Sequence, residues 1–361
     1  MADRRAERQA ALRQLLEDRE LEGLLVSHLP NVRWLTGFTG SAGVALVLPG
    51  RVVLVTDFRY AVQAPQEVGA LAEVAIERSS VWGRIQRLLG EAKPGRVGFE
   101  AHVLPAREAD RVGALVGAGA TATSDLVESL RQVKDDGEVA AIREAGRLAL
   151  EALDEVLATV RAGERELDVA ARLELALRRR GSEWHPFETI VASGPRSALP
   201  HARTSTRELA RGDLLLIDFG ARVDGYCADV TRTVTLGPAD DRQRTVHDLV
   251  REAQQRAREQ VRGGMTGRDA DTLAREVIAA RGFGDAFGHS LGHGLGLEVH
   301  EAPRLAATAE AAIPVGAVVT VEPGIYLPGW GGVRLEDDVW LAPDGPVLLT
   351  DGRTGLLELD A

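Results

Sequence analysis

The first third of the chain alternates short apolar runs with polar turns. Leu12, Leu15 and Leu16 recur at the spacing of one helix face, which predicts an N-terminal helix. Short aliphatic runs follow, and such runs are typical of buried strands: Gly23–Ser27, Val44–Leu48, Val52–Thr56 and Arg96–Phe99. The pattern predicts a small α/β domain over about the first 125 residues.

A polar stretch then interrupts this pattern. Residues 131–138 read RQVKDDGE, and the apolar residues behind them share one face of a long predicted helix. With 361 residues, the chain is long enough for two domains. We therefore place a boundary here and expect domains over residues 1–130 and 131–361.

The second part repeats one order of elements twice. In the first pass, two predicted helices precede three strands: 138–161, Glu166–Arg180, then Glu188–Ala192, Asp213–Phe219 and Tyr226–Leu236. In the second pass, two helices precede a segment rich in glycine and histidine and then two strands: Asp240–Val261, Asp269–Arg281, then Ala317–Tyr326 and Gly332–Leu341. The order predicts two copies of one unit made of a helix pair and a hairpin.

Composition narrows the classes of function. Apolar residues make up 45% of the chain and charged residues 27%, which is typical of a globular protein. The net charge of −11 argues against nucleic acid and anionic membranes as partners, because both select clustered positive charge. No apolar run approaches the ~20 residues of a membrane span, and residues 1–20 lack the apolar core of a signal peptide. The lone Cys227 excludes an intramolecular disulfide and fits a reducing compartment, so we expect a cytoplasmic protein.

Two acids flank the turn of the first predicted hairpin. Asp224 and Gly225 form a two-residue turn signal, and with these residues at the turn Asp218 faces Thr231 across the hairpin. Asp229 is then the diagonal neighbour of Asp218 on the same face. One face of this hairpin is therefore expected to present two carboxylates.

The second hairpin repeats that arrangement. Glu322 and Glu336 are symmetric about Gly329, inside the turn-like sequence PGWGG. All four acids are embedded in apolar strands, where neighbouring like charges destabilise the fold unless something neutralises them. Any one of these acids is readily explained as a strand cap or as the partner of an arginine such as Arg232 or Arg334. Four acids at matching positions of a repeat instead favour a cation site.

Histidines lie near glycine-rich turns of the second part. His201 occurs in ALPHARTS, and His289, His293 and His300 occur in GHSLGHGLGLEVHE, where the glycines argue against a helix. A lone histidine is more often structural, but four carboxylates with one imidazole suit a pair of divalent ions: Mn²⁺ first, with Co²⁺, Fe²⁺ or Zn²⁺ as alternatives. Two such ions bridged by carboxylates and a water form a hydrolytic site.

Several segments together resemble the signature of one known family. The sequences DFG, DVTRT, GHGLGLEVHE, VTVEPGIY and GGVRLEDD occur in the order found in the "pita-bread" metallopeptidases, which include Xaa-Pro aminopeptidase, Xaa-Pro dipeptidase (prolidase) and methionine aminopeptidase. NVRWLTGFTGSAG and TDFRYAVQA resemble the creatinase-like first domain of bacterial Xaa-Pro peptidases. The resemblance implies an α+β protein. It would have a small α/β creatinase-like N-terminal domain and a C-terminal pita-bread domain with a pseudo-twofold repeat and a curved antiparallel sheet.

The resemblance also implies roles for the residues that match its motifs. Five residues would bind two divalent ions: Asp218, Asp229, His293, Glu322 and Glu336. Asp218 would bind one ion, His293 and Glu322 the other, while Asp229 and Glu336 would bridge both. Glu322 would also carry the proton from the attacking water to the leaving amine, and His300 would stabilise the oxyanion. His201 and His289 would line the substrate side, and Arg334 would either orient the Glu336 carboxylate or contact the substrate.

The implied activity is hydrolysis of the bond between a first residue and a following proline. The first domain favours an Xaa-Pro aminopeptidase, and an Xaa-Pro dipeptidase that accepts only dipeptides is the alternative. A methionine aminopeptidase usually lacks the first domain, and creatinase or a non-catalytic binding relative lacks metal ligands that this chain has. The resemblance further implies peptide substrates with proline at the second position, and a homodimer.

Departures from the family pattern lie near the expected substrate entrance. After ALPH the chain reads ARTSTREL in place of a glycine-containing segment, and Trp184 stands where a small polar residue is common. A dipeptidase needs a cation for the proline carboxylate or a loop that blocks longer peptides. The candidate cations are Arg33, Arg196 and Arg203. Phe187 and Tyr326 are candidate pocket walls, although core packing explains both equally well.

Overall fold

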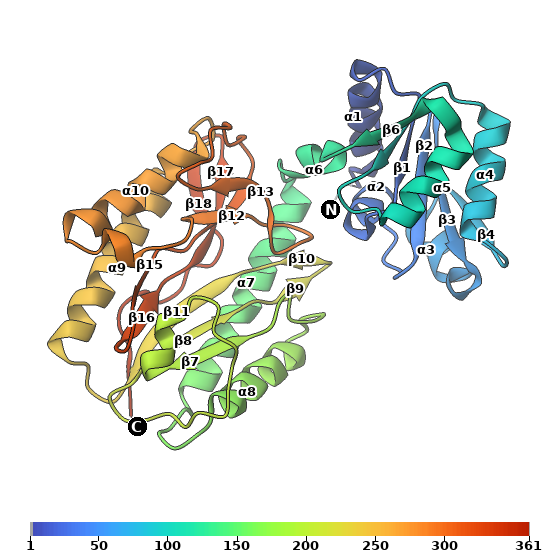
Figure 1. Cartoon of the computed structure of the whole chain (residues 1–361). Coiled ribbons are helices and arrows are strands. Elements are labelled where there is room, and N and C mark those ends of the chain that lie inside the picture. Colours follow the sequence, from blue (N-terminus) through green and yellow to red (C-terminus); the bar gives the residue numbers. More distant parts are fainter. Residues whose placement is uncertain (1–2, 361) are drawn as a thin grey trace. The chain divides into compact units, whose positions relative to one another are not determined.

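The computed structural model describes residues 3–360, and the chain divides into two compact units, Met1–Arg131 and Gln132–Ala361 (Figure 1). Unit 1 below refers to the first of these ranges and unit 2 to the second. Among residues 3–360, no helix combines the length and the apolar character needed to cross a bilayer.

Unit 1 is built on a six-stranded mixed sheet with the order β4-β3-β2-β1-β5-β6. The strands are β1 (Gly23–Val26), β2 (Gly43–Leu48), β3 (Arg51–Asp57), β4 (Glu73–Glu77), β5 (Val97–Glu100) and β6 (Ala120–Thr123). The helices are α1 (Arg5–Asp18), α2 (Leu29–Thr36), α3 (Gln63–Val68), α4 (Val81–Ala92), α5 (Ala106–Val116) and α6 (Leu126–Arg131). Helices α4 and α5 pack through Ile85, Leu88 and Val112 on a core that the central strands provide.

The sequence pattern located the four central strands of this sheet and missed its two edges. The residues of β1 and β5 are buried throughout, whereas Glu73 in β4 and Ala122 in β6 are exposed. An edge strand faces solvent along one side and therefore carries fewer apolar residues, so its pattern is weak. The four strong runs are the ones with neighbours on both sides.

Unit 2 consists of two helix pairs and their strands. The helices are α7 (Asp136–Leu157), α8 (Glu166–Arg179), α9 (Asp241–Gln260) and α10 (Gly267–Ala280). The strands of the first half are β7 (Ile190–Ser193), β8 (Leu214–Phe219), β9 (Arg222–Val223), β10 (Tyr226–Cys227) and β11 (Val230–Leu236). Those of the second half are β12 (Gly292–Gly294), β13 (Glu301–Leu305), β14 (Val318–Val321), β15 (Gly324–Leu327), β16 (Gly331–Arg334), β17 (Asp337–Ala342), β18 (Gly345–Leu348) and β19 (Glu358–Leu359).

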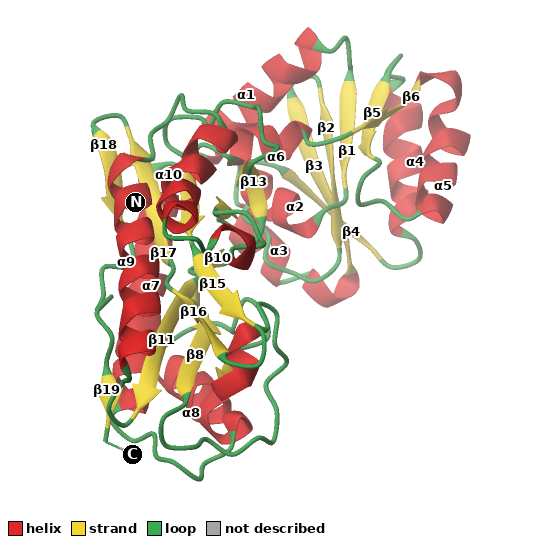
Figure 2. Ribbon diagram, turned by 60° about the vertical axis from the view of Figure 1, so that its left-hand side comes forward, coloured by secondary structure: helices red, strands yellow, loops and turns green. Residues whose placement is uncertain are grey.

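Each helix pair has its own hydrophobic core. Leu153 of α7 and Leu173 of α8 belong to one buried cluster with Leu215 of β8. Val250 of α9 and Ile278 of α10 belong to a second cluster that includes residues of β14, β15 and β17. Strands β8, β11, β15 and β16 lie next to one another in unit 2, so the two hairpins meet there (Figure 2).

The strands of both hairpins are shorter than the sequence predicted. The expected strand Tyr226–Leu236 is divided into β10 and β11, and Ala317–Tyr326 is divided into β14 and β15. The expected strand Gly332–Leu341 is divided into β16 and β17. Proline explains one break, because Pro323 has no N–H to donate to a ladder. Three of the four acids, Asp229, Glu322 and Glu336, lie in these breaks and only Asp218 lies inside a strand, which corrects the expectation that all four are strand residues.

His247 of α9 gives unit 2 a pH-dependent stability. The residue has 0% exposure, neither ring nitrogen has a hydrogen-bond partner among residues 3–360, and burial lowers its pKa from 6.5 to about 4. Between these two values the His247 imidazole is protonated in the unfolded chain and neutral in the folded chain. The free energy of unfolding therefore falls as the pH falls from about 6.5 to 4. We compare the unfolding free energy of His247→Leu with that of the wild type. We expect the difference, variant minus wild type, to be about 2 kcal/mol larger at pH 5 than at pH 8.

Urea unfolding of both proteins in chelator, followed by tryptophan fluorescence, measures this difference. The comparison at pH 8 is the control, because the imidazole is neutral there in both states. An equal stability difference at the two pH values would contradict the argument.

Candidate metal centre

The turn positions predicted the register of both hairpins correctly. Asp218 of β8 pairs with Thr231 of β11. Asp224 and Gly225 both adopt the left-handed backbone (φ 48° and 78°) that a tight hairpin turn requires. In the second hairpin Val321 pairs with Asp337 and Gly324 pairs with Arg334, so Glu322 and Glu336 lie opposite each other between these two ladders. In each hairpin the two acids therefore occupy the positions that the turn predicted.

His293 comes from β12, which runs between β13 and β14. Glycines flank it on both sides because the neighbouring backbones are too close for a side chain: a Cβ on Gly292 would lie 2.0 Å from the Thr320 carbonyl oxygen, and one on Gly294 would lie 2.2 Å from the Ala302 oxygen. The GHG sequence is thus a strand with two close approaches. It directs the imidazole of His293 toward the acids of both hairpins.

The structure brings the acids and His293 together. One ligand atom each from Asp229, His293 and Glu336 lies within 4.8 Å of the others. His293 Nε2 lies 3.8 Å from Asp229 Oδ2 and 3.5 Å from Glu322 Oε1. Asp218 faces the same point from β8, since Arg334 binds it beside Thr231, whose hydroxyl donates to Glu336 Oε2 (2.6 Å). All five predicted ligands therefore belong to one cluster.

The protonation of His293 fits a cation at this point. Its Nδ1 lies 2.9 Å from the Gly294 carbonyl oxygen, which only accepts, so the ring proton is on Nδ1. Burial lowers the pKa of His293 to about 4 and keeps the ring neutral. Nε2 therefore turns an unshared electron pair toward the carboxylate oxygens of Asp229 and Glu322. A lone pair that faces carboxylate oxygens is unfavourable unless a proton or a cation lies between them.

The carboxylates fit a cation for the same reason. Burial, and then the neighbouring Glu336 and Asp218, raise the pKa of Asp229 well above its usual value. Burial followed by the charge of Asp218 raises the pKa of Glu336 to about 8, and burial also raises the pKa of Glu322. Among residues 3–360, the buried atoms Asp218 Oδ1 and Asp229 Oδ1 have no hydrogen-bond partner. Buried oxygens without donors are suited to divalent ions.

Arg334 joins the two hairpins. Its buried guanidinium binds the Asp218 carboxylate and donates to Thr231 Oγ1 (3.0 Å) and to the Tyr326 hydroxyl (2.8 Å). The guanidinium also donates to the carbonyl oxygen of Pro200 (3.2 Å), the residue before His201. Arg334 therefore orients ligands and the ALPH segment together. The sequence had left open whether this arginine orients Glu336 or contacts substrate.

Tyr326 is part of this network as well as of the core. Its hydroxyl accepts from Arg334 and donates to His289 Nε2 (2.9 Å), because His289 Nδ1 donates to the Ser290 carbonyl oxygen (2.8 Å). Burial raises the pKa of Tyr326 to about 12 and lowers that of His289 to about 4, so both groups are neutral at pH 7. The hydrogen bonds thus run in one direction, from Arg334 through Tyr326 to His289.

The remaining predicted histidines lie near the cluster. The ring centroids of His300 and His293 lie 4.4 Å apart, and His300 is exposed. His201 is exposed too, and it lies close enough to His289 and His300 for its charge to lower the pKa of both. His201 and His300 are therefore exposed near the acids, whereas His289 is half-buried.

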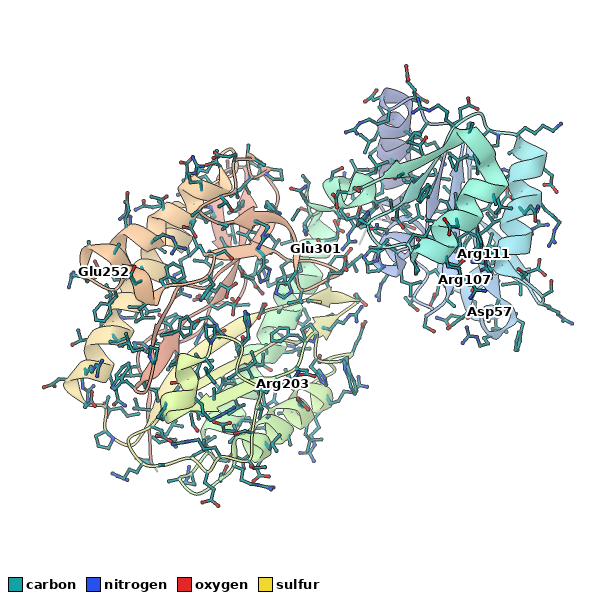
Figure 3. All side chains as sticks on the ribbon, in the orientation of Figure 1. Asp57, Arg107, Arg111, Arg203, Glu252 and Glu301 are labelled. Carbon is teal, nitrogen blue, oxygen red and sulfur yellow. The ribbon has the colours of Figure 1, made fainter. Side chains whose placement is uncertain are left out.

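The structure separates the candidate cations for a substrate carboxylate. Arg196 is committed to the fully buried Glu166 (3.1 Å), so its guanidinium has a structural partner. Arg203 is exposed on the loop between β7 and β8 (Figure 3). Arg33 belongs to unit 1. The exposed Trp184 stacks on Arg178, with the guanidinium carbon 4.9 Å from the ring centroid, while Phe187 is half-buried.

Sequence reasoning missed the acids that follow Glu336. Asp338 Oδ2 accepts the Asp229 backbone N–H (3.1 Å) and so fixes the segment that carries this ligand. Asp337 points to the opposite side, where its buried carboxylate binds Arg232 (2.7 Å) and Arg258 (2.9 Å). The available signal was the run EDD in an apolar strand, since consecutive strand residues face opposite sides and two of three acids must face one side.

Known protein families match both units. Residues 140–343 match metallopeptidase family M24, and residues 8–133 match the creatinase/prolidase N-terminal domain. An uncharacterized peptidase of Bacillus subtilis, YqhT, is 39% identical over 349 residues, which cover 96% of this chain and 99% of that protein. These matches confirm the predicted fold class and the family that the motifs indicated.

Solved structures agree along nearly the whole chain. A structure described as an Xaa-Pro dipeptidase from Bacillus anthracis has a TM-score of 0.95 and 37% identity, covering 98% of this chain and 100% of that one. One described as an X-Pro aminopeptidase from Thermotoga maritima has a TM-score of 0.90 and the same 37% identity, covering 96% and 100%. These two structures thus bear different descriptions at the same sequence identity.

Proposed function

Because the chain belongs to metallopeptidase family M24, and within it to the Xaa-Pro peptidases, we propose that it is an Xaa-Pro aminopeptidase that releases the first residue of a peptide whose second residue is proline. The observation that carries the proposal is the gathering of four carboxylates, two of them buried, around one neutral imidazole in unit 2. Hydrolysis of a peptide bond is the chemistry that such a set supports.

The five residues would hold two divalent ions. Asp218 would bind one ion and His293 and Glu322 the other, while Asp229 and Glu336 would bridge the two. When bound, the ions polarise the scissile carbonyl and supply a water acidic enough to act as a nucleophile near neutral pH. We propose Mn²⁺, because hard carboxylate oxygens with a single imidazole suit a hard-to-borderline ion.

Glu322 transfers the proton from the attacking water to the leaving amine in this proposal. The leaving group of an Xaa-Pro bond is a secondary amine, which leaves only after its nitrogen is protonated. Glu322 reaches across to His293 from the break between β14 and β15, and Thr320 Oγ1 donates to its Oε1 (3.5 Å). From there its carboxylate takes the proton of the attacking water and gives it to the prolyl nitrogen.

In this proposal the surrounding residues stabilise the oxyanion and position the other side chains of the site. His300, next to His293, donates to the oxyanion that forms on the carbonyl oxygen. Arg334 holds Asp218 in place, and through Tyr326 it also holds His289. His201 and His289 line the side that receives the proline. The Xaa-Pro amide has no N–H, so recognition depends on the shape of this side and on the free amino group of the substrate.

An Xaa-Pro dipeptidase is the second candidate. Its support is the B. anthracis structure, which bears that description and has the TM-score of 0.95. Of the two candidate arginines in unit 2, Arg203 is exposed and could meet a terminal proline carboxylate, whereas Arg196 pairs with Glu166. A dipeptidase would use such a cation to select substrates that end at the proline.

One assay distinguishes the two candidates. Protein loaded with Mn²⁺ is given the peptides Ala-Pro, Ala-Pro-Ala and Ala-Pro-Ala-Ala-Ala, and free alanine is measured. We expect release from the tripeptide and the pentapeptide, loss of release in chelator, and recovery with Mn²⁺ in preference to Co²⁺, Zn²⁺ or Fe²⁺. Ala-Ala-Ala is the control substrate, and it should stay intact.

The product pattern decides between the candidates. Release from Ala-Pro alone would replace the proposal by the dipeptidase. Equal cleavage of Ala-Ala-Ala would refute selection for proline, and activity unaffected by chelation would refute the metal centre.

Assembly and compartment complete the proposal. We propose a homodimer, as the family resemblance implies. Size-exclusion chromatography with light scattering measures the mass of the assembly. A cytoplasmic location is supported by the single, buried Cys227, whose pKa burial raises to about 12, because a thiol of this kind forms no disulfide.

A further inference from the structure

Lysine is scarce in this chain. The sequence has 43 lysine and arginine residues, and only Lys93 and Lys134 are lysines. Lys93 is exposed at the C-terminal end of α4. Lys134 is the opposite case, because its side chain is 1% exposed. A buried lysine in a chain that otherwise uses arginine indicates a place that needs a compact ammonium group and does not suit a planar guanidinium.

The ammonium of Lys134 is paired with a carboxylate inside unit 2. Lys134 Nζ lies 3.1 Å from Glu301 Oε2, and the Glu301 side chain is 7% exposed. The backbone of Lys134 is fixed too, since its N–H donates to the Gly316 carbonyl oxygen (3.0 Å). Removing one partner of such a pair leaves an uncompensated buried charge, so the pair holds the two segments together.

Glu301 stabilises the hairpin formed by β12 and β13 (Figure 3). Its Oε1 accepts the Glu298 backbone N–H (3.0 Å), and its carboxylate packs against Gly296, where an added Cβ would lie 2.7 Å from Oε2. The Gly296 carbonyl oxygen in turn accepts the Cys227 N–H (2.8 Å), two residues before Asp229. The carboxylate of Glu301 is therefore the internal support of the loop 295–300.

This hairpin carries two residues of the proposed centre. His293 lies in its first strand, and His300 directly precedes Glu301. The two rings contact each other at 4.4 Å. His293 is held by its own strand between β13 and β14, whereas His300 lies on the exposed side and depends on the loop for its position.

We propose that Lys134 is a positioning residue that sets the place of His300 through its buried ion pair with Glu301. The inference rests on the proposed function, because it gives His300 its task at the oxyanion. Lys134 itself touches no substrate. It acts by holding the carboxylate that shapes the loop leading into His300.

The test is a double-mutant cycle between Lys134 and His300. Lys134→Met keeps the length of the side chain and removes the charge. We expect it to lower kcat on Ala-Pro-Ala by about tenfold and to leave KM within about twofold, because a small displacement of a stabilising group affects the transition state more than the bound substrate. In a His300→Ala background the same substitution is expected to leave kcat unchanged within about twofold.

Two further variants make the test decisive. Lys93→Met is the matched control and should keep the wild-type kcat. Lys134→Met with Glu301→Gln leaves no unpaired buried charge, so it keeps the test available if the single variant unfolds, and it is expected to show the same loss of kcat. A wild-type kcat for Lys134→Met, or an equal loss of kcat with and without His300, would overturn the proposal.

Hydrogen exchange provides a readout that does not depend on turnover. In Lys134→Met the amides of residues 295–301 should exchange faster than in the wild type, while those of β8 and β11 should be unchanged. If the wild type cleaves no Xaa-Pro peptide, the proposed function fails, and the exchange result still shows whether the pair holds the loop. Unchanged exchange at 295–301 would overturn the proposal on its own.

Discussion

Glu322→Gln is expected to lower kcat on an Xaa-Pro peptide by about 10³-fold, the range of a lost general acid and base. The amide has nearly the shape of the carboxylate and still offers an oxygen, but it cannot take up and return a proton. Glu322 faces His293 from the break between β14 and β15, where no other side chain is proposed to carry a proton. The measurement is kcat on Ala-Pro-Ala with metal content determined on the same sample.

The metal content separates two explanations of a loss of activity. A protein that keeps both ions and loses turnover supports the proton role, and one that loses an ion supports only the ligand role. Glu310→Gln is the matched control, because Glu310 is exposed and pairs with Arg268 on the surface. If Glu322→Gln kept more than a tenth of the wild-type kcat, the proton role would be wrong.

Arg334→Lys is expected to lower kcat by about 10²-fold although the positive charge is kept. Arg334 binds Asp218, Thr231 and Tyr326 at once through a rigid planar fork. A lysine has a single nitrogen and cannot hold these groups in one geometry. Asp218 is then free to turn, and the hydrogen bond that fixes Tyr326 beside His289 is lost.

The measurements for this variant are kcat and the affinity for Mn²⁺ by calorimetry. We expect weaker metal binding, because Asp218 must be ordered when the ion binds. Arg256→Lys serves as control, since Arg256 pairs with Glu276 (3.0 Å) on the outside of the helix pair. Wild-type kcat and affinity in Arg334→Lys would show that charge alone is sufficient and would contradict the argument.

Local signals were sufficient for most of the fold. The predicted helices and strands of unit 2 recur in order, because each helix buries one apolar face against its own sheet. In unit 1 the central strands were found and the edge strands β4 and β6 were missed, since half-exposed strands lack a strong apolar pattern. The lengths of the hairpin strands were overestimated, because an apolar run does not reveal where a ladder is interrupted.

The sequence by itself determined the register of both hairpins. Each tight turn fixes which residues are opposite, so the positions of Asp218, Asp229, Glu322 and Glu336 followed from turn chemistry alone. The tertiary structure decided how the two hairpins meet: that Arg334 reaches Asp218, that Thr231 donates to Glu336, and that Lys134 is buried against Glu301. These contacts join residues more than a hundred positions apart, and their geometry depends on the packing of whole elements, which no local pattern encodes.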